Sequence, residues 1–182
     1  MTLSQKDYYE YLNTHLNLLF FVGSYTGILN KNMEFGEFLK TNFQTKGLCR
    51  DAFLKEKEEL LDEYIGDGTE IPEEQLLILD GFRNSIIGRL VLLKCLSKHA
   101  IFKSIEDGKF YAVKALSDSF DELIPDYPAV FELSILPFKG QIIYDGFIKG
   151  GNVKIGTNMK KSLHQEYMQA KKNNEIITSL DE

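Results

Sequence analysis

The spacing of apolar residues changes near residue 99, and this change constrains the fold more than any other feature of the chain. Before that point apolar residues recur with a helical period, whereas beyond it short apolar runs of β type alternate with turn residues. Runs of helices followed by runs of strands are typical of α+β proteins. The sequence therefore predicts an α+β fold, with amino-terminal helices packed on a small antiparallel sheet and a carboxy-terminal helix.

The length and composition of the chain fit a single domain. The chain has 182 residues, of which 43% are hydrophobic. A chain of this size buries about 70% of the surface that it exposes when unfolded. We therefore predict one domain over residues 1–182, made of a mainly helical part at 1–99 and a β-rich part at 100–182 that includes the final helix.

Three helical regions are predicted in the first part. The first begins at Ser4, because serine is a preferred amino-terminal cap. The second covers residues 33–64, with a break near 42–46. The third covers residues 72–96 and opens on a proline, which favours the first helical position. It is apolar nearly all round beyond residue 76, which predicts a central buried helix.

Several residues of this third helix bear on function. Gly81, Ser85 and Gly88 would lie in one strip of small side chains, which either packs within the monomer or meets a second chain. The second possibility allows a protein partner or a homo-oligomer. Arg83 on the same helix needs an acidic partner or access to solvent. His99, just beyond the helix, is predicted to interact with its carbonyl end.

The β-rich part contains three further signals. A hairpin is predicted around an Asp107-Gly108 turn, because this dipeptide favours tight hairpin turns. Ser119 and Glu122 have the spacing of a capping box, which predicts a short helix. Thr157 or Asn158 is predicted to cap the last helix. The buried side of that helix is expected to carry Met159, Leu163, Tyr167 and Ala170.

The segment I-L-P-F-K-G-Q-I-I-Y-D-G-F at residues 135–147 raises the question of a functional site. Pro137 and Gly140 are accounted for by a turn between two strands. Asp145, which precedes a glycine, allows two interpretations. Its carboxylate accepts backbone amides in a turn, which is the favoured one, or it faces a cleft at the end of a strand. In the second case Arg83 is the expected partner.

Other catalytic and cofactor patterns fail when their spacing is tested. The glycine-rich run G-F-I-K-G-G-N-V-K-I-G lacks the order of a phosphate-binding loop. The acidic run at 56–74 lacks the spacing of a calcium loop, and the three histidines stand in separate predicted elements. Cys49 and Cys95 have no activating base nearby in the sequence. The sequence thus predicts neither a cofactor nor a metal site.

Charge and the amino terminus narrow the class of partner. The formal net charge is −6, with 11 basic against 15 acidic residues at 1–98 and 10 against 12 at 99–182. Neither part is a basic lobe, which disfavours nucleic acid. The amino terminus lacks a signal peptide, and the apolar run at 18–22 is too short to span a bilayer. We therefore expect a cytoplasmic protein without a membrane partner, and its small-molecule ligand is left open.

Three stretches of the chain resemble a known family. They read L-D-G-F-R-N-S-I-I-G-R-L-V-L-L-K-C-L-S-K-H-A-I-F, F-Y-A-V-K-A-L-S-D-S-F-D-E-L and I-L-P-F-K-G-Q-I-I-Y-D-G-F. Over residues 60–180 the chain is similar to an uncharacterised family of bacterial proteins, some of which carry a metal-binding SEC-C tail. This chain ends in I-I-T-S-L-D-E without a cysteine cluster, so the resemblance implies no metal role here. It implies a bacterial cytoplasmic origin and no activity.

Two classes of function follow from these observations. The preferred one is a non-catalytic intracellular binding or accessory module. The alternative is a small hydrolase or nucleotide-handling enzyme with a site near Asp145, which would act as the acid or metal-binding residue. Arg83, His99 and Lys139 would then stabilise charge or transfer protons. This alternative requires the four side chains to converge in one pocket.

Overall fold

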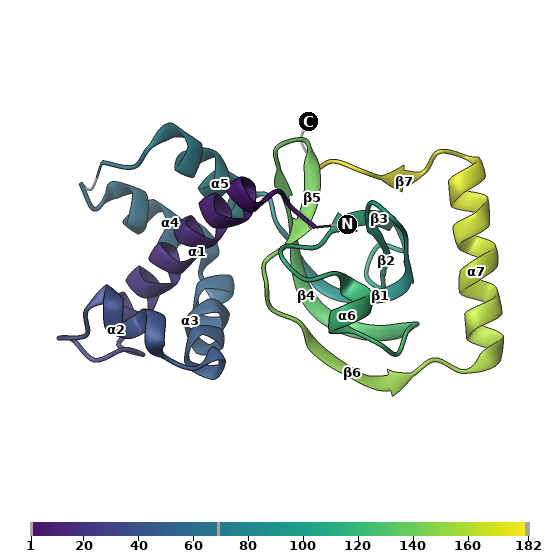
Figure 1. Ribbon diagram of the computed structural model, residues 1–182, viewed down its shortest axis with the longest axis horizontal. Helices are drawn as coiled ribbons and strands as arrows, with labels where there is room; N and C mark the ends of the chain where they lie inside the picture. The colour runs from purple at the N-terminus through teal and green to yellow at the C-terminus, as the bar shows by residue number, and fades with distance from the viewer. Residues whose placement is uncertain (1, 69, 181–182) are drawn as a thin grey trace. The chain divides into compact units, whose positions relative to one another are not determined.

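The computed structural model describes residues 2–68 and 70–180 and has an α+β fold, as predicted. The chain divides into two compact units, which are described separately (Figure 1). Lys6–Arg83 forms a helical unit. Met1–Gln5 and Asn84–Glu182 belong to a second unit, which holds the sheet and the last helix and is called the barrel unit below.

Over the described residues up to 83, the helical unit contains five helices, of which α2 is the shortest. They are α1 (Gln5–Tyr25), α2 (Phe35–Lys40), α3 (Phe43–Lys55), α4 (Lys57–Gly66) and α5 (Glu73–Arg83). The predicted break near 42–46 is confirmed at Asn42, whose side chain accepts a hydrogen bond of 2.8 Å from the backbone amide of Thr45. This contact satisfies one of the amides that the start of a helix leaves unpaired.

Aromatic rings from three helices form the centre of the helical unit. The ring of Phe82 lies 5.9 Å from that of Tyr11 and 5.7 Å from that of Phe53. His15 is also buried here, with its ring 4.7 Å from Phe82. Burial and the nearby charge of Arg50 lower the pKa of His15 to about 3. The imidazole is therefore neutral at physiological pH.

A glycine lets α1 approach its neighbours closely. Gly23 is buried, and a Cβ at this position would lie 2.6 Å from Cys49 Sγ and 2.7 Å from Leu29 Cδ1. We expect Gly23→Ala to destabilise the protein by about 2 kcal/mol, because the core must move to accept the methyl group. Gly66→Ala is the matched control, since nothing lies within 4 Å of its Cβ position. Urea unfolding followed by circular dichroism tests this; equal stability of the two variants would contradict it.

The prediction of a third helix over residues 72–96 is wrong beyond residue 83. α5 ends at Arg83, and β1 (Ile86–Cys95) follows it directly as a strand. Gly81 and Gly88 therefore lie on a helix and a strand, and no helical strip of small residues exists. The argument for a protein partner or homo-oligomer that rested on this strip is lost. The change from helix to strand falls at residue 84 rather than near residue 99.

Seven strands and two helices make up the barrel unit over its described residues 84–180. After β1 come β2 (Ala100–Ser104), β3 (Phe110–Lys114), α6 (Phe120–Leu123), β4 (Ala129–Phe138), β5 (Gln141–Tyr144), β6 (Lys149–Lys154), α7 (Thr157–Lys172) and β7 (Ile176–Ile177). The predicted hairpin turn is confirmed, with Gly108 at a φ of 74°. The capping box between Ser119 and Glu122 is also present.

Five of these strands form a closed barrel, in which each strand pairs with two others. β1 pairs with β2 and β2 with β3 in antiparallel fashion, β3 pairs with β5 in parallel, and β5 pairs with β4. β4 then pairs with β1 over seven positions, from Ile86↔Ile135 to Leu92↔Ala129. The sheet is thus mixed and mostly antiparallel. The five strands thus form a barrel with a short helix between β3 and β4, and the OB fold is a five-stranded barrel architecture of this general kind.

The short helix α6 packs against the interior of this barrel. The ring of Phe120 lies 5.0 Å from those of Phe102 on β2 and Tyr144 on β5. Phe102 and Phe120 are fully buried. A single helical turn therefore anchors two strands that the chain order keeps apart.

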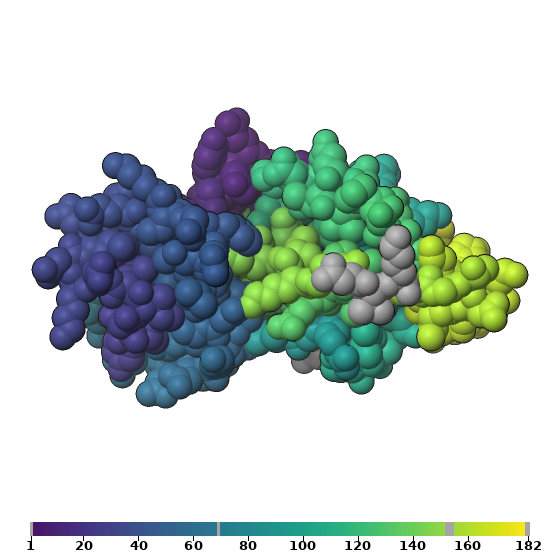
Figure 2. Space-filling view, turned by 90° about the horizontal axis from the view of Figure 1, so that it is seen from below, coloured from purple at the N-terminus to yellow at the C-terminus, as the bar shows by residue number. Residues whose placement is uncertain are grey.

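The last helix covers the outer face of β2 and β3. Tyr167 and Ala170 of α7 pack in one cluster with Ile101, Phe110 and Ala112. Figures 1 and 2 show α7, in yellow, beside the teal strands of the unit. Two details differ from the prediction.

The first difference is Met159, which is 58% exposed rather than buried, so the buried side of the helix begins at Leu163. The second is the cap. The amino-terminal cap position of α7 is occupied by Gly156, which has no side chain to accept a hydrogen bond, and Thr157 is the first helical residue.

Candidate functional site

Arg83 is held by two carboxylates of the neighbouring helix. Its guanidinium lies 2.6 Å from Glu58 Oε2 and 2.7 Å from Asp62 Oδ1, both on α4. These hydrogen bonds raise the pKa of Arg83. The side chain thus joins the end of α5 to α4, and its acidic partners are not the Asp145 that the sequence suggested.

Asp145 lies at the end of β5 and is 1% exposed. Its Oδ1 accepts a hydrogen bond of 3.1 Å from the backbone amide of Phe147, and its own amide donates to the carbonyl of Ser134 at 3.0 Å. Gly146 between them has a φ of 91°, a conformation that favours glycine. These contacts are those of a turn in which the carboxylate bonds to the backbone.

Lys139 lies in the two-residue turn between β4 and β5. Phe138 pairs with Gln141 across this turn, and the ammonium of Lys139 lies 5.2 Å from the ring centre of Phe138. The turn begins at Phe138, and Pro137 belongs to β4. Lys139 and Asp145 therefore lie at opposite ends of β5, and this strand holds them apart.

His99 lies in the tight connection between β1 and β2. The backbone amide of Leu96 donates to the carbonyl of His99 at 2.9 Å, which closes the turn around Ser97 and Lys98. No helix precedes it among the described residues 84–98, so the predicted role at a helix end is wrong. Burial and the charge of Lys98 lower the pKa of His99.

A pocket of about 320 Å³ opens beside this turn, at one end of the barrel. The register explains how distant segments meet there: Ala100 pairs with Val113, and Val113 pairs with Ile142. The lining residues come from the β1–β2 turn, β3, the start of β5 and the two ends of the chain. They are Thr2, Ser97, Lys98, His99, Ala112, Lys114, Gln141 and Thr178.

The lining of this pocket is polar and positively charged. Two lysines and one histidine face three hydroxyl groups and one amide, and none of the described lining residues is acidic. Lys114 Nζ donates to Gln141 Oε1 at 3.1 Å, which leaves the amide nitrogen of Gln141 as a donor. The pocket thus combines positive charge with several hydrogen-bond donors and can receive an anion.

Sequence reasoning singled out His99 alone among these lining residues. Ser97 and Lys98 could have been recognised with it, because they share a short polar segment between apolar runs. Lys114 and Gln141 are 27 positions apart and meet only because β3 and β5 run in parallel. No feature of the sequence predicts that pairing.

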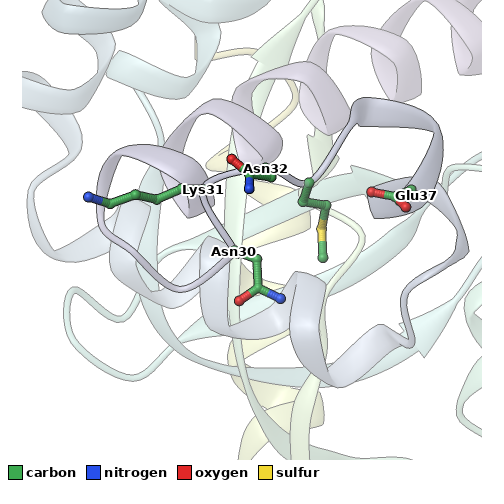
Figure 3. Close-up of a pocket in the computed structure, with 5 residues that line it drawn as sticks. Asn30, Lys31, Asn32 and Glu37 are labelled. Atoms are coloured by element: carbon green, nitrogen blue, oxygen red, sulfur yellow. The ribbon is translucent and has the colours of Figure 1, made fainter.

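Other hollows in the molecule have different characters. One in the helical unit, of about 540 Å³, lies on the loop before α2 and is shown in Figure 3. Its lining is Asn30, Lys31, Asn32, Met33 and Glu37. Lys31 extends away from the other labelled side chains, so no set of charges converges there. A mainly apolar hollow of about 440 Å³ lies beside the start of α7 and includes Val91, Val130 and Met159.

The two cysteine thiols are at least partly buried. Burial raises the pKa of both thiols, Cys49 and Cys95, which disfavours the nucleophilic thiolate. Within residues 2–68 and 70–180, no three His, Cys, Asp or Glu side chains come together in a group suited to a metal ion. None of the helices described in these ranges combines the length and hydrophobicity needed to span a bilayer.

Comparison with protein-family models, with curated proteins and with solved structures finds no match to this chain.

Proposed function

We propose that this protein is a non-catalytic binding module that takes a small ligand in the pocket between the β1–β2 turn and the start of β5. The observation that carries the proposal is the convergence of Ser97–His99, Lys114 and Gln141 on one cavity. These residues come from three separate parts of the chain, and the barrel pairing places them together.

The position of the pocket within the barrel supports the same function. In OB-type barrels the face of strands 2 and 3 and the loops that follow strands 1 and 4 bind oligonucleotides and oligosaccharides. The pocket lies at the corresponding place here, since it includes the β1–β2 turn, β3 and the first residue of β5. Because a fold alone does not establish function, this similarity supports the location and not the identity of the ligand.

An enzyme centred on Asp145 has weaker support. Its carboxylate bonds to the amide of Phe147 in a turn, Lys139 lies at the other end of β5, and Arg83 is paired with Glu58 and Asp62. These contacts therefore give each of the three charged groups a structural role. His99, by contrast, lines the pocket beside the β1–β2 turn.

Native mass spectrometry of the full chain, incubated with a dialysable small-molecule extract of cells, tests the proposal. We expect a small molecule that remains on the protein and is released by gentle activation. Thr178→Trp should lower the bound fraction, because the indole fills the pocket from an exposed position. Gln165→Trp, on the exposed side of α7, is the matched control and should bind normally. A wild-type protein that retains nothing, or equal binding by both variants, would contradict the proposal.

A further inference from the structure

The chemistry of the pocket restricts the class of ligand that it can bind, and this inference rests on the proposed function. The formal charge of the chain is unevenly distributed between the two units. Residues 6–83 contain 8 basic and 15 acidic side chains, whereas 1–5 and 84–182 together contain 13 basic and 12 acidic ones. The helical unit therefore has a formal charge of −7 and the barrel unit one of +1, so the net charge of −6 does not argue against an anion at the barrel.

Two lysines line the pocket, and none of the described lining residues carries a carboxylate that would offset their charge. Lys114, at the end of β3, is half-buried and donates to the neutral oxygen of Gln141, so this contact does not neutralise its charge. Lys98 is exposed on the β1–β2 turn, and burial together with the charge of Lys98 lowers the pKa of His99 beside it. A ligand with two negative charges would complement the two ammonium groups.

The remaining donors favour a ligand with many acceptor atoms. The lowered pKa of His99 favours the neutral imidazole, which offers one N–H group. Ser97, Thr178 and Gln141 add two hydroxyls and an amide around the same space. A phosphate monoester has three terminal oxygens and carries between −1.5 and −2 charges at pH 7. It therefore matches this set of donors better than a singly charged carboxylate does.

The last helix limits the size of the ligand. Successive bases of a single strand stack on aromatic side chains of an OB-type sheet face. Here Phe110 on that face packs against Tyr167 of α7, and Lys103 forms an ion pair with Glu166 of the same helix. On β3, residues 110, 112 and 114 share one face by alternation. α7 covers the first two, and the pocket is the part of the face that remains open at Lys114.

We infer that the pocket binds a small phosphate monoester, of at most about the size of a mononucleotide, through Lys98, Lys114 and the donors around His99. The cavity volume of about 320 Å³ is at the lower end of the range for small-molecule sites. A nucleic-acid strand is excluded from the neighbouring face by α7. The ligand is thus a free phosphorylated molecule.

Isothermal titration of the full chain at fixed ionic strength tests this inference with five probes. The probes are inorganic phosphate, AMP, adenosine, malonate and an eight-residue oligothymidylate. We expect AMP and phosphate to compete for one site, adenosine to fail to bind, malonate to bind more weakly than AMP, and the oligonucleotide to bind no more tightly than AMP.

Charge-reversal variants of single lysines test which residues form the binding site. Lys114→Glu should weaken AMP binding by about tenfold or more, since it replaces a charge-assisted hydrogen bond by repulsion. Lys98→Glu should weaken it as well, and because Lys98 is exposed on a turn, this variant is expected to fold normally. Lys161→Glu on the exposed side of α7 changes the net charge equally and should leave binding unchanged.

Each other result overturns the inference. Equal binding of adenosine and AMP would show that the phosphate is not recognised, and equal binding of malonate would show a general dianion site. Tighter binding of the oligonucleotide would show that a strand is the ligand. If no probe binds while the cell extract still yields a ligand that Thr178→Trp excludes, the phosphate inference fails and the proposed function stands. If the extract yields nothing either, both fail.

Discussion

Replacing Phe102 by alanine is expected to destabilise the protein by about 3–5 kcal/mol, which is the usual cost of removing a buried phenylalanine ring. Phe102 is fully buried on β2, and its ring lies 5.0 Å from that of Phe120 in an edge-to-face arrangement. The substitution therefore leaves a cavity where the short helix α6 meets the barrel. Urea unfolding at pH 7 measures the loss, and because the chain has no tryptophan, circular dichroism is the suitable signal.

Leu123→Ala is the control for this experiment. Leu123 belongs to the same short helix and is 42% exposed. We expect its replacement to change the free energy of unfolding by less than about 1 kcal/mol, as for surface positions in general. If Phe102→Ala cost no more than Leu123→Ala, the ring would not be part of a packed interior, and the description of a closed barrel anchored by α6 would be wrong.

Acidification from pH 7 to pH 5 is expected to cost the helical unit about 2 kcal/mol through His15 alone. The pKa of this buried histidine is lowered from 6.5 to about 3. A depressed folded-state pKa means that the unfolded chain binds the proton more readily. The contribution of His15 to stability is therefore fully present above pH 6.5 and is lost progressively as the pH falls toward 3.

The choice of pH range separates this effect from the carboxylates. Glu106, Asp107 and Glu166 have lowered pKa values in the fold, so their stabilisation is lost mainly below their usual titration range, near pH 4. His99 has a lowered pKa as well and contributes with the same sign in the barrel unit. A variant at His15 is therefore needed to assign the effect.

His15→Gln provides that comparison. Glutamine keeps a polar group near the hydroxyl of Tyr11, which lies 3.3 Å from Nδ1 of His15, but it does not titrate. We expect the variant to be less stable than the wild type at pH 7 and to lose less stability on going to pH 5. Parallel loss in both proteins would show that His15 is not buried as a neutral base. Urea unfolding at several pH values gives the two slopes.

The sequence predicted the fold class because local signals and tertiary structure agree over most of the chain. The break at Asn42, the Asp107-Gly108 turn and the capping box at Ser119 all depend on neighbouring residues, and all three are confirmed. The strand β1 was missed because I-I-G-R-L-V-L-L-K-C is apolar in consecutive positions. Such a run fits a buried helix and a curved barrel strand equally well.

The long-range features could not be predicted in the same way. Closure by β1 and β4, and the parallel pairing of β3 and β5, join segments that the chain order separates. The pocket depends on both strand register and turn position, so its lining could not be assembled from spacing. His99 was noted from the sequence, but for a role at a helix end that the structure does not contain.

A two-dimensional ¹H–¹⁵N NMR titration of the full chain with inorganic phosphate tests the proposed site directly. We expect the largest shifts at the amides of Ser97, Lys98 and His99, with further shifts at Lys114 and Gln141. Shifts centred on the loop at residues 30–37, or spread over the lysines of α7 without a maximum at the β1–β2 turn, would contradict the proposed site.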